Sequence, residues 1–188
     1  MTLNLFKKKI SERTAVASTI PAYFSSIEKH WPALKKKLLE QSVATGKDQL
    51  VFQVPSMAPI DLVLALIALD LQALPNIFPS DQAKRIHNLV LTFMATQTKE
   101  GTYAREEIEL YEEEWKKALN DPQHINLPYD AISNRLLHRW LYGKETIDLL
   151  GQHFSNPILV MAVSEMLLKL SGAWEMLKQH CKVVSDRE

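Results

Sequence analysis

The sequence predicts an all-α protein: a single-domain multi-helix bundle of seven or eight helices around a central apolar helix. Apolar residues recur at helical spacing along most of the chain, and only five of the 188 residues are glycine. Several prolines fall between the periodic segments, where they punctuate helices. Apolar residues make up 46% and charged residues 23%, which is ordinary globular usage. We expect a loose basic arm over residues 1–10, a helical domain over 11–182 and a loose tail over 183–188.

The central helix is expected over Pro59–Leu74, PIDLVLALIALDLQAL, which is apolar on almost every face. It is shorter than the roughly 20 residues that span a bilayer, and it carries Asp61 and Asp70. Such a helix in a soluble chain is normally surrounded by other helices. Asp61, Ala65, Ala68 and Gln72 share one narrow strip, which marks a close neighbour or water.

The other elements follow the prolines and glycines. A helix is expected from near Pro21, and Pro32 either opens a second segment or kinks one long helix. Gln49–Val54 is the only strand-like run, and without a partner it is expected to be an extended loop. Further helices are expected from Pro79, from Gly101, from Pro128 to Tyr142, within residues 144–154, and from Pro157 to about Lys178.

The helix after Gly101 carries six glutamates between residues 106 and 114. Its apolar stripe turns most of them toward water, where Glu112–Lys116 and Glu113–Lys117 have the spacing of favourable pairs. A di-iron site in a helical bundle uses a Glu-x-x-His pattern, which does not occur in this sequence. We therefore expect a solvated glutamate face and no metal site. The apolar stripe of this helix consists of Ala104, Ile108, Tyr111, Trp115 and Ala118.

No catalytic or nucleotide-binding motif is present, and no two histidines are spaced i, i+4. The single cysteine, Cys181, excludes an intramolecular disulfide, and no cofactor is expected. The net charge is zero, which gives nucleic-acid binding no support. The charge is uneven, however: residues 1–47 carry nine Lys/Arg against three Glu, and residues 100–130 carry three against nine Asp/Glu. We expect a cytoplasmic protein.

Asp70 is at odds with its setting, because it falls among the apolar Val63, Leu66 and Ile67 of the central helix. An unpaired buried carboxylate is costly, so a cation or several donors should lie near it, or the helix end should reach solvent. A structural ion pair with Arg85, Arg135 or Arg139 is the favoured interpretation. The alternative is an acid in a pocket with a raised pKa.

Four polar side chains share one arc of the Pro128–Tyr142 helix, beside its apolar face. Two guanidiniums, an imidazole and a phenol can together hold a carboxylate, a phosphate or an acidic partner surface. This is the candidate ligand- or partner-binding group, and a solvated cationic face is the favoured alternative. The four residues are Arg135, His138, Arg139 and Tyr142.

These observations favour a non-enzymatic helical protein-interaction or regulatory protein that can self-associate. The second hypothesis is a small-molecule-binding protein or enzyme with a pocket between helices, using Asp70, His138 and the two arginines. The third and weakest hypothesis is a peripheral membrane protein that uses Leu3–Lys9. A protein partner or a second copy is thus favoured over a small molecule, and a membrane or nucleic acid is disfavoured.

Overall fold

The structure, a computed structural model, describes residues 7–44, 55–97, 101–121, 128–142 and 157–186, and confirms the all-α class. Side chains of residues 41–44, 97, 141 and 142 lie outside the described part. The helix expected within residues 144–154 and the loop expected at 49–54 also fall outside it, so the number of helices stays a prediction. The elements are β1 (Lys8–Ser11), α1 (Glu12–Ala44), α2 (Ala58–Ile77), α3 (Ser80–Gln97), α4 (Gly101–Leu119), α5 (Pro128–Tyr142), α7 (Pro157–Leu170), α8 (Ala173–His180) and β2 (Cys181–Val184).

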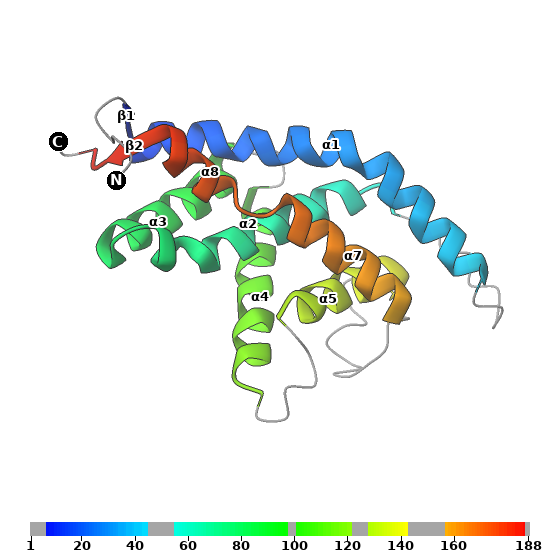
Figure 1. Ribbon diagram of the computed structural model, residues 1–188. Coiled ribbons are helices and arrows are strands. Elements are labelled where there is room, and N and C mark those ends of the chain that lie inside the picture. The colour runs from blue at the N-terminus through cyan, green and yellow to red at the C-terminus, as the bar shows by residue number, and fades with distance from the viewer. Residues whose placement is uncertain (1–6, 45–54, 98–100, 122–127, 143–156, 187–188) are drawn as a thin grey trace.

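Helix α1 is one long element that bends part-way along its length (Figure 1). It begins at Glu12, well before the start expected near Pro21, and it continues through both Pro21 and Pro32. Both prolines lie on the exposed side of the helix. The two carbonyls that lose an N–H partner there can bond to water, and the prolines account for the bend. Pro32 therefore bends a helix and does not open a new one.

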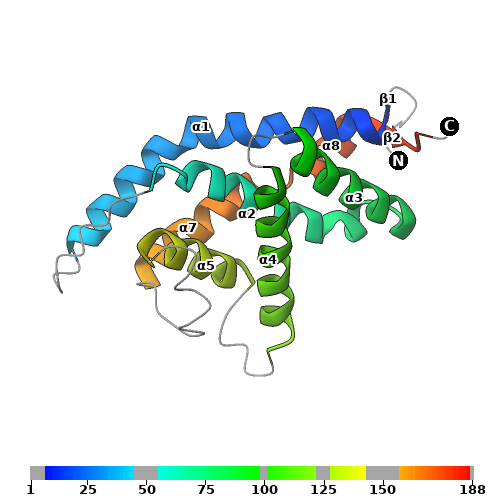
Figure 2. The ribbon, with the colours of Figure 1, turned by 180° about the vertical axis from the view of Figure 1, so that it is seen from behind.

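Helix α2 is buried along most of its length, and it contacts α1, α3, α4, α5, α7 and α8. It lies between α7 on one side and α4 on the other, as the two opposite views show (Figures 1 and 2). It ends at Ile77 and not at Leu74, because Pro75 falls in the last turn, where only the Leu71 carbonyl loses its N–H partner.

Two helical stretches are long and apolar enough to cross a membrane by composition alone: Ala58–Ile77 and Pro157–His180. About 72% of the first is buried inside the protein, as expected of a core helix, but only 33% of the second. The second stretch thus leaves apolar surface exposed.

The strip of α2 that holds Asp61, Ala65, Ala68 and Gln72 faces α4 rather than water. Tyr103 Oη of α4 lies 3.0 Å from Asp61 Oδ1 at one end of the strip. Gln72 Nε2 donates to Glu112 Oε1 over 2.6 Å at the other end. The two small alanines between these bonds let the helices approach closely.

The final helix is interrupted, contrary to expectation. α7 ends at Leu170, Gly172 takes the left-handed conformation with φ 97°, and α8 begins at Ala173. The carboxylate of Asp70 accepts hydrogen bonds from the backbone amides of Gly172 and Ala173, where α8 begins. These bonds stabilise the break between α7 and α8. A sequence pattern that continues across Gly172 could not reveal this contact.

The two chain ends meet in a small parallel ribbon, in which β1 pairs with β2 (Figure 1). Lys9 lies opposite Lys182, and Ile10 lies opposite Val183. Ile10 and Val183 pack against the core. Residues 8–10 of the expected loose arm and residues 183 and 184 of the expected tail therefore lie in strands, because each strand supplies the hydrogen-bonding partner of the other.

Candidate functional site

The two arginines of the predicted binding group lie inside the protein, in what we call the buried ion cluster: Asp61, Glu107, Arg135 and Arg139. Arg139 Nη1 lies 2.5 Å from Glu107 Oε2, and Arg139 Nε lies 3.3 Å from Asp61 Oδ1. Arg135 Nε lies 3.4 Å from Glu107 Oε1. The cluster therefore joins α2, α4 and α5 through two negative and two positive charges.

Neutral groups complete the surroundings of Asp61. Trp140 Nε1 donates to Asp61 Oδ2 over 3.1 Å, and Arg139 donates to Tyr103 Oη, which in turn contacts Asp61. Burial raises the pKa of the Asp61 carboxyl, while Arg139 and Trp140 oppose this rise. Burial also lowers the pKa of the Arg139 guanidinium. Burial thus disfavours the charged form of both groups, whereas the attraction between Asp61 and Arg139 favours it.

Tyr111 lies beside the cluster with its ring fully buried. The Arg135 guanidinium carbon is 5.7 Å from the centre of this ring, a cation–π distance. The buried Oη has no hydrogen-bond partner among the described residues. Burial, followed by the nearby negative charges, raises the pKa of Tyr111 well above its ordinary value, so the phenol stays neutral. It offers no nucleophile or base.

The buried ion cluster holds the helices together and does not present a reactive group. Each carboxylate faces a guanidinium, so neither is available as a general base for a ligand. The solvated cationic face expected for Arg135 and Arg139 is wrong, because their side chains are only 9% and 13% exposed. His138 is half-buried on the same helix, and the side chain of Tyr142 lies outside the described residues.

Glu107 is the member of the cluster that the sequence reasoning missed. It is completely buried, although it belongs to the glutamate-rich helix expected to face water. Its position three residues after Ala104 and four before Tyr111 places it on the apolar stripe of that helix. This spacing is the feature of the sequence that could have predicted the burial of Glu107.

Asp70 occupies a separate site between α1, α2 and α8. Its carboxylate accepts hydrogen bonds from Tyr23 Oη at 2.7 Å, from the Gly172 amide at 2.7 Å and from the Ala173 amide at 2.9 Å. Burial raises the pKa of Asp70, although these three bonds oppose the rise. The expected donors are present, but none is an arginine. Asp70 thus acts as a cap for α8, supplied from another helix.

Two further buried acids tie α3 to its neighbours. Glu112 lies 2.9 Å from His87 Nε2, and Glu12 pairs with Arg85 at 2.8 Å. The structure describes other ion pairs than the expected Glu112–Lys116 and Glu113–Lys117. Glu112 points inward and pairs with His87. Lys117 instead pairs with Glu114 at 2.8 Å.

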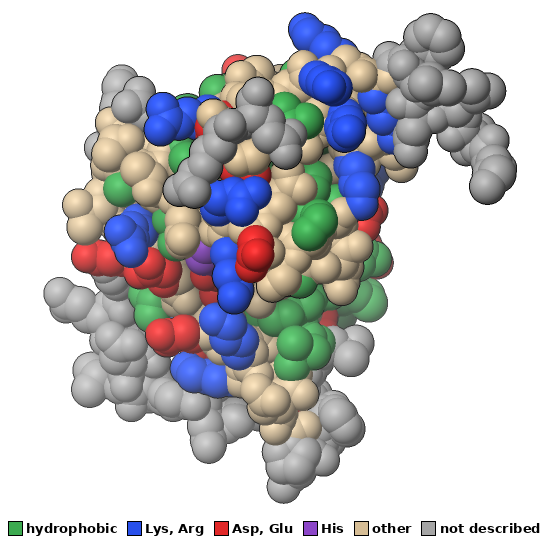
Figure 3. Space-filling model, turned by 90° about the vertical axis from the view of Figure 1, so that its left-hand side faces the viewer, with side chains coloured by type: hydrophobic (Ala, Val, Ile, Leu, Met, Phe, Trp, Pro, Cys, Tyr) green, Lys and Arg blue, Asp and Glu red, His purple; other side chains and the backbone are tan. Residues whose placement is uncertain are grey.

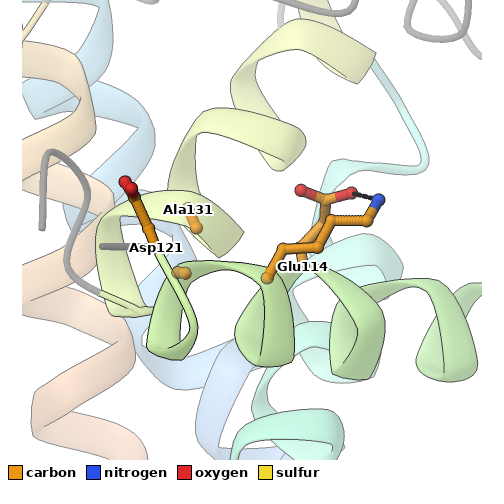
Figure 4. Close-up of a pocket in the computed structure, with 5 residues that line it drawn as sticks. Glu114, Asp121 and Ala131 are labelled. Atoms are coloured by element: carbon orange, nitrogen blue, oxygen red, sulfur yellow. Dashed lines mark hydrogen bonds and ion pairs between the residues drawn. The ribbon is translucent and has the colours of Figure 1, made fainter. Parts of the chain in front are cut away.

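A small pocket of about 250 Å³ lies where α4 ends and α5 begins (Figure 4). Lys117 pairs with Glu114 at its side, and neither Asp70 nor the arginines of the cluster line it. In the described part of the chain, no group of three or more His, Cys, Asp or Glu side chains could hold a metal ion. The pocket is lined by Glu114, Lys117, Ala118, Asp121 and Ala131.

Among the described helices, α7 has the most exposed large apolar side chains. Ile158, Met161 and Leu168 are 44%, 54% and 60% exposed. At 3.6 residues per turn, they and Glu165 fall within an arc of about 80°. We call these three apolar residues the α7 stripe. Glu165, between them, pairs with Lys37 of α1 at 2.8 Å.

Comparisons with protein-family models, with curated proteins and with solved structures found no match.

Proposed function

We propose that this protein is a non-enzymatic helical interaction or regulatory protein, and that it self-associates through the α7 stripe. The observation that carries the proposal is the exposure of Ile158, Met161 and Leu168 on one side of one helix. Apolar surface gathered in this way marks a contact with another molecule more often than scattered single residues do. Methionine suits such a surface because its flexible side chain adapts to a partner.

A second copy is the partner that the stripe fits. If two α7 helices pack antiparallel about a two-fold axis, Met161 of each copy meets Leu168 of the other. The axis then passes near Glu165. The Lys37–Glu165 pair leaves little net charge at that point, so two such pairs can approach without strong repulsion. A stable interface needs roughly 1,000 Å² in total, so the C-terminal half of α1 is expected to contribute as well.

The alternative, a small-molecule-binding protein or enzyme, has less support. Its candidate groups are spread out: Asp70 caps α8, whereas Arg135 and Arg139 are neutralised in the buried ion cluster. None of them lines the pocket between the end of α4 and the start of α5.

Light scattering over a concentration series tests the proposal. The wild-type mass is expected to rise toward twice that of one chain, and the Met161→Gln/Leu168→Gln variant is expected to stay monomeric. Met57→Gln/Leu119→Gln is the matched control, because it removes exposed apolar side chains elsewhere and should behave as wild type. A wild-type protein that stays monomeric at its highest soluble concentration would contradict self-association.

A further inference from the structure

A charged side chain interrupts the α7 stripe at its centre. Glu165 follows Met161 by four residues and precedes Leu168 by three, so it lies on the same side of α7 as both. Lys37 Nζ of α1 lies 2.8 Å from Glu165 Oε2. The acid that interrupts the stripe therefore already has a cation beside it, supplied by the neighbouring helix.

The Lys37–Glu165 pair can make further hydrogen bonds. A carboxylate accepts about four hydrogen bonds, and an ammonium group donates three. The contact between the two residues uses Glu165 Oε2 alone, and the side chains of Lys37 and Glu165 are 44% and 60% exposed. Both ions can therefore bond to another molecule without losing the contact that they already make.

A two-fold axis would bring this pair up to a copy of itself. In the antiparallel arrangement of two α7 helices, the axis passes near Glu165, and a residue beside a two-fold axis meets the same residue of the second copy. Two carboxylates brought together in this way repel each other, which weakens an interface strongly. Lys37 offsets this repulsion, because the lysine of each copy can lie between the two acids.

We propose that the Lys37–Glu165 pair orients self-association: Lys37 of each copy bonds to Glu165 of the second copy as well as to its own. This inference rests on the proposed self-association through the α7 stripe and names the groups that give the contact its specificity. One acid and one base beside a two-fold axis are complementary to themselves. The apolar side chains supply most of the affinity, and the charges fix the register and orientation of the two helices.

The other charges of this face are compatible with such a contact. Lys36 and Glu40 pair with each other within α1 at 3.7 Å. Lys169 is exposed one turn after Glu165, about 6 Å farther along α7 from the expected axis. Its positive charge adds to the need for an acid at the axis.

The opposite charge pattern makes another face less suited to a second copy. Figure 3 looks onto the end of the molecule where β1 and β2 pair, and Lys and Arg side chains run in a band down this face. Lys9 lies opposite Lys182 there, and both are exposed. A two-fold contact through this band would bring lysine against lysine, whereas the α7 face offers both signs of charge.

Charge reversal tests the proposal. Lys37→Glu places four acids around the axis and Glu165→Lys places four lysines there, so each should raise the dissociation constant of the dimer by about tenfold or more. An equimolar mixture of the two variants should associate nearly as wild type does, because opposite charges then meet across the axis. The double variant Lys37→Glu/Glu165→Lys should also self-associate as wild type does. Sedimentation velocity over a concentration series measures each sample.

Lys84→Glu and Glu113→Lys are the matched controls. They make the same changes of net charge at exposed positions on α3 and α4, two helices that do not pack against α7. Each should self-associate as wild type does, and mixing them should not strengthen association. Circular dichroism verifies that every variant is folded.

The outcomes separate this inference from the proposed function. Dimers of Lys37→Glu and Glu165→Lys that are as stable as wild type would overturn the ionic contact and leave self-association through the α7 stripe intact. The ionic contact is also overturned if both variants stay monomeric when mixed, or if the two control variants lose association equally. A monomeric wild type would contradict the proposed function itself, and this inference with it.

Discussion

At the scale of single residues, buried acids are the main feature of this protein, and each pairs with groups from another element of the fold. The acids differ in their donors: a guanidinium, an imidazole, two backbone amides or a pair of arginines. The sequence predicted that Asp70 needs donors, because its helical neighbours are apolar. It could not predict which donors, because Gly172 and Ala173 lie about a hundred residues away in the chain. The five acids are Glu12, Asp61, Asp70, Glu107 and Glu112.

The central residue of the buried ion cluster is Glu107, which faces both arginines. Glu107→Gln leaves two buried guanidiniums with only Asp61, so we expect the free energy of unfolding to fall by about 3–5 kcal/mol. Denaturant unfolding measures this change. Glu113→Gln, an exposed site on the same helix, is the control and should change stability by no more than about 0.5 kcal/mol. Equal effects of the two substitutions would contradict the burial and pairing described for Glu107.

At the scale of helices and strands, the sequence located most helices but not the contacts that end them. The stripe Ala104, Ile108 and Tyr111 correctly predicted the inward face of α4. Most glutamates of this helix were expected to face water, but Glu107 and Glu112 are buried. The break between α7 and α8 depends on Asp70, and the ribbon depends on the meeting of two chain ends. Neither of these two contacts produces a periodic pattern in the sequence.

The contact between α3 and α4 is expected to depend on pH. The hydrogen bond that His87 donates to the Glu112 carboxylate raises the pKa of His87, although burial opposes the rise. A raised folded-state pKa means that the native state binds the proton more tightly than the unfolded state does. The stabilisation is therefore fully present below the unfolded-state pKa of about 6.5, and it is lost as the pH rises through the folded-state pKa.

Comparison of wild type with His87→Gln measures this dependence. Urea unfolding between pH 6 and pH 9 should give a stability difference that is largest at pH 6 and shrinks as the pH rises. Lys116 is the other charged group that acts on His87, and it lowers the pKa, so Lys116→Gln should move the loss to higher pH. If the stability difference between wild type and His87→Gln does not vary with pH, protonated His87 is not the source of the stabilisation.

At the scale of the whole molecule, α2 contacts each of the other described helices, and strands β1 and β2 pair at one end of the molecule (Figure 2). Charge within the protein is largely used to join helices, as the buried ion cluster shows. The contact with another molecule that we propose uses the α7 stripe. Surface exposure of this kind is a tertiary property. Leu159, Val163 and Leu167 of α7 are buried, and the helical period of the sequence does not tell which of the other apolar residues stay exposed.

Site-specific disulfide cross-linking tests the proposed α7 contact most directly. In a Cys181→Ser background, Glu165→Cys places a thiol near the expected two-fold axis, and Glu113→Cys places one on the exposed side of α4. Under mild oxidation, the account predicts a covalent dimer from Glu165→Cys at a rate well above that of Glu113→Cys. Equal rates for the two variants, or no covalent dimer from Glu165→Cys, would contradict self-association through α7.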